Sequence, residues 1–359
     1  MKHKLAFRRY RLPFRGALRT AHGPWAEREG ILIRTEDEAG RTGYGEVAPI
    51  PWFGTETVEE AEEVLGKLAG DVDDATVESI PERLGCVRFA LASALGGVGR
   101  IAHNPPSPAG ERRVKDDAPN HSRHPVAALL PAGKAVLAAA DKALEQGYVA
   151  LKWKVGVHDA ADEWGVLDDL LARLPAHVKL RLDANGAWNS RLAAKWLERC
   201  AERPVEFVEQ PCFAGASQGP AHQRKTDDIL LGLANDYPTP IALDESVTGM
   251  ASLREWLGRG WRGVVVVKPA LAGPPAAVLA LLENHRADAV FSSALETAVG
   301  GRAALQVAFS YQGPRPRALG FGVAPLFTDA RFDALPAVPF VSADAVEHLN
   351  PEDVWNALS

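Results

Sequence analysis

Cysteine is scarce in this sequence. The chain contains three, Cys86, Cys200 and Cys212, which lie far apart and lack metal-ligand spacing. An odd, scattered set excludes a disulfide framework and predicts free thiols in a reducing compartment. No long apolar run follows the basic N-terminus or occurs elsewhere, so we expect neither a signal peptide nor a membrane span. These absences together favour a cytoplasmic protein.

The sequence also lacks a strong charge bias. It has 40 basic and 46 acidic residues, which gives a net charge of −6. Nothing in this balance requires nucleic acid or an anionic membrane, so we expect neither as a partner, and the oligomeric state stays open. Hydrophobic residues make up 47% of the 359 positions, which suits one large domain with a sizeable core plus a smaller domain.

Local patterns divide the chain into four segments. Residues 1–102 begin with strand-like segments and continue with amphipathic stretches, which predicts an α+β capping domain. Residues 103–125 are rich in proline and in mixed charge, as is typical of a linker. Residues 126–323 alternate short apolar strands with helical stretches, and we expect residues 324–359 to pack back on the capping domain.

The alternation after residue 126 decides the fold class. Strand candidates separated by helices or long connections of about one βα unit indicate a (β/α) barrel rather than an open sheet. We therefore predict an α/β protein with a modified (β/α) TIM-type barrel and an α+β N-terminal capping domain that is completed by the C-terminal tail. The strands are expected at residues 126–131, 148–155, 178–183, 205–210, 240–245, 263–268, 288–293 and 318–323, with helices such as Gly133–Gln146 and Ala161–Leu174 between them.

The predicted strand at Leu151–Gly156 carries two lysines. Side chains alternate faces along a strand, so Lys152 and Lys154 point the same way. Repulsion between two ammonium groups and loss of hydration both favour release of a proton, which can make a lysine a usable base near neutral pH. On this stretch alone, lysines that keep an exposed sheet edge in solution are an equally good interpretation.

Ionisable residues recur at the ends of the neighbouring strands. Asp183, Glu209 and Asp244 end three successive strands, and Lys268 ends the next. The carboxyl ends of barrel strands surround the active site, so the three carboxylates can converge. An oxygen-rich cluster of this kind suits a hard divalent cation, above all Mg²⁺ with Mn²⁺ as an alternative.

The lysines complete a chemical hypothesis. A metal that binds a substrate carboxylate makes the adjacent C–H acidic, and a lysine beside that carbon can take the proton. Lys154 and Lys268 come from strands on either side of the metal strands, so we expect them to face each other across the bowl. A helix N-cap would explain any one aspartate, but five ionisable strand ends in succession favour a site.

Two Gly/Pro-rich loops near the N-terminus carry aromatic residues. They span residues 19–25 and 49–54, and their candidate site residues are Thr20, His22, Trp52 and Phe53. Loops that hold tryptophan and phenylalanine often cover an apolar surface. They either cover a substrate site or close the core of the capping domain itself, and the sequence favours neither.

The ordered set of motifs resembles one enzyme family. Lys-x-Lys at 152–154, Asp-x-Asn at 183–185, Glu-Gln-Pro at 209–211, Asp-Glu-Ser at 244–246 and Val-Lys-Pro at 267–269 are similar to the muconate lactonizing subgroup of the enolase superfamily. The resemblance covers nearly the whole chain and includes Gly43–Glu46. Within the subgroup, residues 20–23, 48–54 and 291–297 resemble o-succinylbenzoate synthases. Those enzymes dehydrate a succinyl-hydroxycyclohexadiene carboxylate on the route to menaquinone or phylloquinone.

The resemblance implies a role for each residue. Asp183, Glu209 and Asp244 would hold Mg²⁺. Lys154 would abstract the α-proton and then protonate the departing hydroxyl from the same face, while Lys268 would stabilise the enediolate by its charge. The remaining candidates are Lys152, which would tune Lys154; Asn185, which would orient the metal shell; Glu245 beside Asp244; and Ser292 and Ser293, which either contact the substrate or cap a helix.

Other activities share this catalytic set. An N-acylamino acid racemase and a muconate-type cycloisomerase are the nearest alternatives, and a non-catalytic binding protein on the same scaffold is a remote one. Dipeptide epimerases usually carry an Asp-x-Asp where this chain has Gly320–Val323, which argues against that activity. The long interval between Glu209 and Asp244 predicts an extra loop around residues 215–220.

Overall fold

The computed structural model describes residues 2–20, 23–68, 70–96, 123–215, 218–314, 317–336 and 338–358. The expected linker at 103–125 lies outside the described residues except for Arg123–Pro125, and so does the candidate site residue His22. Arg123–Pro125 forms strand β5, which pairs with β13 near the C-terminus.

A parallel sheet of seven strands forms the larger portion of the chain. Its order is β12-β11-β10-β9-β8-β7-β6, so strands that follow one another in sequence are neighbours in space. Seven of the expected strands are confirmed, each somewhat shorter than expected. They are β6 (Ala128–Leu130), β7 (Ala150–Lys154), β8 (Lys179–Asp183), β9 (Val205–Glu209), β10 (Ile241–Leu243), β11 (Val264–Val267) and β12 (Asp288–Phe291).

The eighth strand, expected at 318–323, is wrong as a full strand. Only Leu319 and Gly320 form bridges, and they connect the two edges of the sheet. Leu319 exchanges hydrogen bonds with Pro125 and Ala127 at 2.8 and 2.9 Å, and the Gly320 amide donates to the Phe291 carbonyl at 2.8 Å. The chain then turns away, and a Cβ at Gly322 would lie only 2.4 Å from the Ala127 carbonyl oxygen. Two residues therefore close the barrel.

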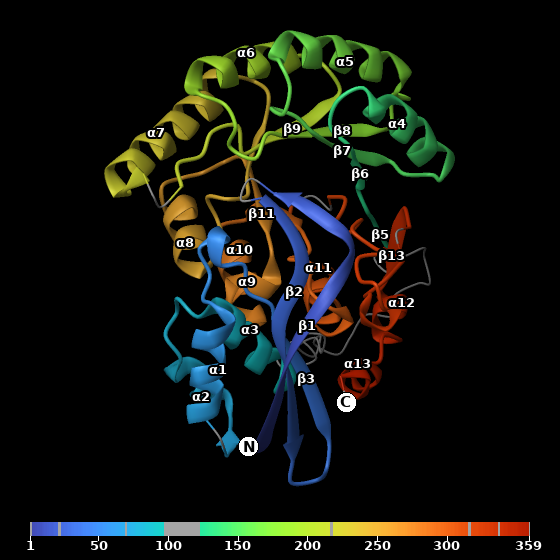
Figure 1. Cartoon of the computed structure of the whole chain (residues 1–359). Helices are drawn as coiled ribbons and strands as arrows, with labels where there is room; N and C mark the ends of the chain where they lie inside the picture. Colours follow the sequence, from blue (N-terminus) through green and yellow to red (C-terminus); the bar gives the residue numbers. More distant parts are fainter. Residues whose placement is uncertain are drawn as a thin grey trace, which may run out of the picture.

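Helices follow the barrel strands and lie on the outside. The larger ones are α4 (Ala135–Glu145), α5 (Ala160–Arg173), α6 (Ser190–Cys200), α7 (Pro220–Asp236), α8 (Met250–Gly258), α10 (Pro275–Asn284) and α11 (Ala298–Ser310), with a short α9 (Pro269–Ala272). Figure 1 shows α4 to α7 arching over the outer side of β6 to β9. Helix α7 takes up half of the interval between Glu209 and Asp244, and of the loop expected around residues 215–220, residues 216 and 217 lie outside the described residues. Among the described helices, none is long and apolar enough to cross a bilayer.

The N-terminal portion is built on an antiparallel sheet of order β3-β2-β1-β4. Its elements are β1 (His3–Thr20), β2 (Gly23–Asp37), β3 (Thr42–Val47), a 3₁₀ turn (Pro51–Phe53), α1 (Val58–Lys67), β4 (Asp71–Val72), α2 (Asp74–Ser79) and α3 (Gly85–Ala94). The long β1–β2 hairpin runs from the chain's N-terminal end toward the barrel (Figure 1). Helix α1 begins with a capping box between Thr57 and Glu60.

The Gly-Tyr-Gly-Glu segment of β3 has a packing role. A Cβ at Gly43 would lie 1.8 Å from the Ala94 carbonyl oxygen, and one at Gly45 would lie 1.9 Å from that of Ala90. Helix α3 therefore packs directly on the backbone of β3, which only glycine permits at these two positions.

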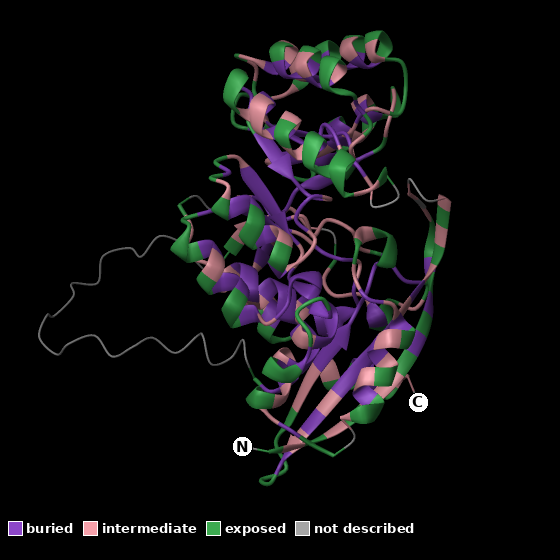
Figure 2. Cartoon of the chain, turned by 90° about the vertical axis from the view of Figure 1, so that its left-hand side faces the viewer, coloured by how far each residue is buried: buried purple, intermediate pink, exposed green. Residues whose placement is uncertain are grey.

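The C-terminal segment contains a 3₁₀ turn (Ala330–Phe332), β13 (Phe340–Ser342), α12 (Ala343–Glu347) and α13 (Pro351–Ala357). It contacts the N-terminal sheet: Phe14 bridges Phe327, and the Arg8 guanidinium donates to the Trp355 carbonyl at 2.8 Å. Figure 2 shows buried residues continuing from the N-terminal strands into the barrel, while exposed residues lie on the outer helix faces. The exact division into domains stays a prediction.

Glu46, at the end of the glycine segment, joins the N-terminal sheet to the barrel. Its carboxylate is fully buried and accepts hydrogen bonds from the Tyr10 hydroxyl at 2.5 Å, the Thr297 amide at 2.9 Å and the Gly300 amide at 2.8 Å. Thr297 caps α11 and Gly300 belongs to its first turn, where the helix dipole favours a negative charge. A single carboxylate thus caps a barrel helix from the N-terminal sheet.

We predict that Glu46→Gln destabilises the fold. Every partner of the carboxylate is a hydrogen-bond donor. The amide NH₂ of glutamine would therefore face donors and leave buried groups unpaired, which should lower the free energy of unfolding by about 2–4 kcal/mol. Urea unfolding measures the change. The control is Glu27→Gln, whose partner Arg11 is 67% exposed and which should change stability by less than about 0.5 kcal/mol. Equal stability of Glu46→Gln and the control would contradict the prediction.

Candidate active site

Parallel pairing sets the predicted site residues side by side. Lys154 pairs in register with Asp183, and Asp183 pairs with Glu209. Asp244 directly follows β10, two residues beyond the partner of Glu209. Because neighbouring parallel strands end at the same edge, the three carboxylates and Lys154 lie in one row at the barrel mouth. Lys268 follows β11, so the strands of the two lysines flank those of the carboxylates.

This row borders a cavity of about 450 Å³ between the barrel mouth and the N-terminal loops. The predicted residues that line it are Lys152, Lys154, Lys268, Asp183, Asp244, Asn185, Glu245, Ser292, Ser293, Thr20, Trp52 and Phe53. Glu209 is 1% exposed and lies behind the surface, in contact with Lys152. The sequence thus predicted most of the lining residues.

Two of the lysines are paired with the carboxylates. The Lys152 amine lies 2.9 Å from Asp183 and 2.7 Å from Glu209, and the Lys268 amine contacts Asp244. Burial would lower the pKa of Lys152, but the surrounding carboxylates outweigh it and raise that pKa above its usual value. Like-charge repulsion was expected to make a lysine of this strand easy to deprotonate, and for Lys152 this is wrong. Its counter-charges come from the neighbouring strands, and the sequence around Lys152 gives no indication of them.

Lys154 differs from the other two. No described residue forms a hydrogen bond or an ion pair with its side-chain amine, although Lys154 is half-buried and lines the cavity. Its amine is therefore available to a bound molecule. The following loop is held by Glu163 of α5, whose carboxylate accepts from the amides of Gly156, Val157 and His158 at 2.8–3.1 Å. The sequence pattern does not indicate this role of Glu163.

The acidic side carries more negative charge than its lysines neutralise. Burial, reinforced by the charge of Asp183, raises the pKa of Glu209 to about 8. Burial and the charge of Asp244 raise the pKa of Glu245 to about 7. One oxygen of Glu245 has no partner among the described residues, while the other accepts from the Asn185 amide at 3.1 Å.

This donor set fits a hard divalent cation. It consists of carboxylate oxygens from neighbouring strand ends, in a buried place where added positive charge relieves repulsion. Within the described ranges, no three acidic, histidine or cysteine side chains already surround one point, because Lys152 and Lys268 engage the carboxylates. For Asp183, Glu209 and Asp244 to hold a cation, these long, flexible amines would have to shift.

Gln210 organises the site, although the sequence showed it only within a motif. Its backbone is left-handed, with φ of 37°, and its side chain is fully buried. The side-chain oxygen accepts from the amides of Asp244 at 2.9 Å and Ser246 at 3.2 Å, and its nitrogen donates to the Ser246 hydroxyl at 2.8 Å. Gln210 thus ties the loop that carries Asp244 to the strand end that carries Glu209.

The two serines do not cap a helix. Helix α11 is capped by Thr297, while the Ser292 hydroxyl donates to the Gly320 carbonyl at 3.1 Å and the Ser293 hydroxyl accepts from the Leu295 amide at 2.9 Å. The helix-capping alternative is therefore wrong for both. Contact with a substrate stays a prediction, and both serines line the cavity.

The N-terminal loops form an aromatic wall over the cavity. Trp25 and Trp52 pack edge to face with ring centres 4.8 Å apart, and the Phe53 ring lies 4.3 Å from the Lys268 amine. Trp52 is 39% exposed, which does not fit a plug for the core of the N-terminal sheet. The described residues of the expected loop at 19–25 are the ends of β1 and β2, and they cover the cavity together with the 3₁₀ turn at Pro51–Phe53. Leu18, Leu129 and Phe213 add to its apolar lining, and the sequence did not single them out.

Comparison with known families agrees with this geometry. The family described as "MenC, N-terminal domain" matches residues 1–97, and the family described as "Enolase C-terminal domain-like" matches residues 135–339. Together they cover both walls of the cavity.

Individual relatives give the same result. An o-succinylbenzoate synthase of Thermosynechococcus vestitus is 38% identical over 90% of this chain and 94% of its own length. Another, of Edwardsiella ictaluri, is 30% identical over 81% of this chain and 82% of its own. The solved structure of the Thermosynechococcus elongatus o-succinylbenzoate synthase, complexed with Mg in the active site, has a TM-score of 0.78 and 35% identity over 99% of both chains.

More distant structures share the fold alone. The L-Ala-D/L-Glu epimerase of Bacillus subtilis has a TM-score of 0.75 at 22% identity, over 95% of this chain and 96% of its own. With both family matches, the close relatives and a row of carboxylates and lysines at the mouth of a (β/α) barrel, this chain belongs to the o-succinylbenzoate synthase family of the enolase superfamily.

Proposed function

We propose that this chain dehydrates 2-succinyl-6-hydroxy-2,4-cyclohexadiene-1-carboxylate to o-succinylbenzoate, in the biosynthesis of menaquinone or phylloquinone. The observation that carries the proposal is the amine of Lys154, which pairs with no described residue and lies in a cavity beside three neighbouring carboxylates. The names of the close relatives support the same reaction. We place it in the cytoplasm, because all three cysteines are free and buried.

Asp183, Glu209 and Asp244 are the residues that would hold Mg²⁺, with Mn²⁺ as an alternative. When bound, the cation stabilises the negative charge that develops on the substrate carboxylate as the neighbouring C–H bond breaks. The hydrogen bonds of Gln210 keep two of these carboxylates together, and Asn185 holds Glu245 beside them.

Lys154 acts on the substrate as base and then as acid. Its neutral amine takes the proton from the carbon next to the carboxylate, and the electron pair of that C–H bond forms the new ring double bond as the C–O bond breaks. Lys154 returns the proton to the departing hydroxyl, so that water leaves from the same face. Lys268 stabilises the developing negative charge from the opposite side by its own charge. The ammonium group of Lys152 contacts Asp183 and Glu209 next to Lys154 and offsets part of their negative charge.

The shape of the cavity suits this substrate class. Part of the lining is polar and carries the lysines and carboxylates, and part is apolar and includes Trp52, Phe53 and Leu129. A cyclohexadiene ring with a flexible acyl chain presents both kinds of surface. Aromatisation supplies a large driving force, so the chemical step needs little further tuning by the site.

The racemase alternative uses the same residues in a different way. Racemisation requires a free base on each face of the substrate carbon. The Lys268 amine contacts Asp244 and the ring of Phe53, while the Lys154 amine is unpaired among the described residues. This asymmetry favours chemistry with one base.

The same proposal includes a division of the chain into domains. We assign a capping domain to residues 1–102, a barrel to residues 126–323 and a C-terminal segment to residues 324–359. The contacts of Phe327 and Trp355 with the N-terminal sheet support the last assignment.

We predict that a substrate panel separates these activities. The cyclohexadiene acid should have the highest kcat/KM, ahead of N-succinyl amino acids and muconolactone. Steady-state turnover of each compound measures this, with loss of water followed for the first and loss of optical activity for the second. A higher kcat/KM for any N-succinyl amino acid would replace the dehydratase proposal by the racemase.

Replacement of the base should abolish turnover. Lys154→Ala should lower kcat by about 10³-fold or more, because general base catalysis contributes about 10²–10⁴-fold. Lys268→Arg keeps a positive charge and should retain traces of dehydration. The matched control is Lys142→Ala, an exposed lysine of α4, which should be unchanged. Turnover of Lys154→Ala near the level of the control would remove Lys154 as the base.

Metal removal should be visible without an activity assay. EDTA should stop turnover and lower the melting temperature, and added Mg²⁺ should restore both. A ligand at 100 times its Kd stabilises a fold by about 2.7 kcal/mol. Calorimetry should show the Mg²⁺-dependent shift in Lys154→Ala but not in Glu209→Gln. Activity and melting temperature that ignore EDTA would refute the assignment of a metal to this site.

A further inference from the structure

Arg28 is a buried arginine that binds backbone instead of acids. It lies in β2 and is 1% exposed. Its guanidinium donates to the carbonyls of Ala48 and Pro49, the latter at 2.5 Å, and to those of Ala294 at 3.3 Å and Leu295 at 3.1 Å. One side chain thus connects two segments that are remote in sequence.

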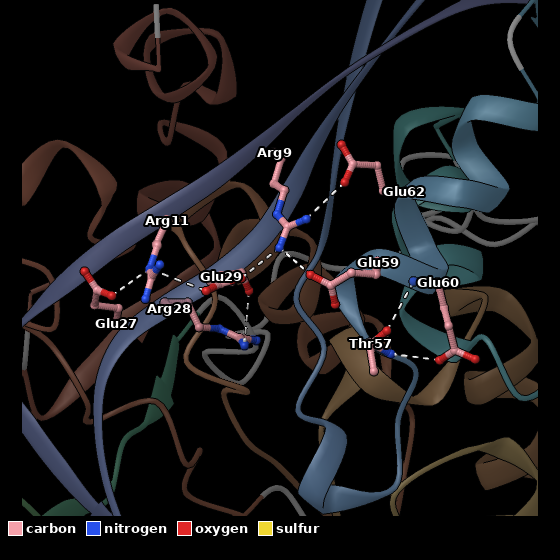
Figure 3. A network of polar contacts seen from close by, with 9 residues as sticks. All are labelled: Arg9, Arg11, Glu27, Arg28, Glu29, Thr57, Glu59, Glu60 and Glu62. Atoms are coloured by element: carbon pink, nitrogen blue, oxygen red, sulfur yellow. Dashed lines mark hydrogen bonds and ion pairs between the residues drawn. The ribbon is translucent and has the colours of Figure 1, made fainter.

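This arrangement is unusual for a buried cation. Buried charges are normally paired, yet no described carboxylate lies within ion-pair distance of Arg28. The carboxylate of its neighbour Glu29 is turned the other way, toward Arg9 at 3.0 Å and Arg11 at 3.4 Å (Figure 3). Hydrogen bonds from a charged donor are stronger than those from a neutral donor and here take the place of water, so the carbonyls must keep their positions for the charge to stay buried.

The two segments belong to the two parts of the chain that enclose the cavity. Ala48 and Pro49 begin the loop that presents Trp52 and Phe53, and Ala294 and Leu295 line the cavity from the barrel side. Leu295 has a left-handed backbone with φ of 62°, a conformation that a leucine adopts only where its surroundings hold it. Arg28 itself does not line the cavity.

The other end of the aromatic loop is anchored separately. Glu56 accepts from the Val87 amide at 2.9 Å, and Arg9 holds Glu59 at 2.5 Å and Glu62 at 3.1 Å on helix α1 (Figure 3). These contacts fix the loop to the N-terminal sheet and α3. Arg28 fixes the beginning of this loop to the barrel by hydrogen bonds, and Phe53 meets Lys268 further along the loop.

We propose that Arg28 is a positioning residue that sets the distance between the aromatic wall and the barrel wall and so determines how tightly the non-reacting end of the substrate is bound. The predicted effect on KM and kcat rests on the proposed function. The reacting end is held by barrel residues, so displacement of the wall weakens binding in the ground state and the transition state alike. Such a change raises KM more than it lowers kcat.

The test compares Arg28→Met with Arg8→Met. Arg8 also joins two remote segments, since it donates to the Trp355 carbonyl at 2.8 Å and stacks on its ring, but it does not line or support the cavity. We expect Arg28→Met to raise KM about 10-fold or more with a smaller fall in kcat, and Arg8→Met to leave KM unchanged. The KM of Arg28→Lys should lie between those of the wild type and Arg28→Met, because one ammonium cannot reach both segments as a planar guanidinium does. If Arg28→Met fails to fold, Arg28→Lys is used in its place.

Hydrogen exchange supplies a readout that needs no substrate. The amides of Ile50, Trp52, Phe53 and Gly54 should exchange at least about 10-fold faster in the Arg28 variants than in Arg8→Met. A loss of melting temperature with KM and exchange unchanged would overturn the proposal and leave Arg28 a purely structural residue. If the wild type fails to turn over the cyclohexadiene acid, the proposed function falls, while the exchange comparison still decides the role of Arg28.

Discussion

Repulsion between carboxylates at the mouth of the barrel is the constraint on which the rest of the site depends. Parallel pairing makes Asp183 and Glu209 immediate neighbours in a buried place, where the pKa of Glu209 rises to about 8. Such a row is stable only with positive charge beside it, which Lys152 and Lys268 supply to some extent. The same property gives the row its affinity for a divalent cation, because unrelieved negative charge is stabilised by binding one.

The connection between the N-terminal sheet and the barrel follows a related rule. Two buried charges, Glu46 and Arg28, reach the barrel segment at 294–300 from the N-terminal sheet. Backbone carbonyls accept from Arg28, and backbone amides together with the hydroxyls of Tyr10 and Thr297 donate to Glu46. The anion caps the positive end of α11, and the cation binds the carbonyls just before that helix. Backbone partners keep a fixed position, whereas a side-chain partner could change rotamer. The contacts of Glu46 and Arg28 with the barrel backbone therefore set the position of the cavity walls.

Most of the barrel and of its site could be predicted from sequence because both depend on local, repeated patterns. Short apolar strands followed by an ionisable residue are recognisable one unit at a time, as at Asp183 and Glu209. The eighth strand was misjudged because apolar residues near 319 look like a strand, while the closure uses only two residues. The roles of Gln210, Glu46 and Arg28 could not be predicted from sequence, because most of their partners are backbone groups far away in the chain, and a backbone partner leaves no pattern in the sequence. The state of Lys152 was missed for a similar reason, since its counter-charges lie on other strands.

Two regions of the chain contribute to the site in different ways. The barrel holds every group proposed to touch the reacting atoms, while the N-terminal loops supply Trp52 and Phe53 and contact the chemistry only where Phe53 meets Lys268. A dehydration driven by aromatisation asks little of the catalytic groups beyond a base near the right carbon. Selection among substrates that share an acidic C–H next to a carboxylate must then come from the fit of the remote end. That fit depends on how the N-terminal loops are fixed to the barrel, so contacts such as those of Arg28, which never reach the substrate, can decide which reaction the same lysines perform.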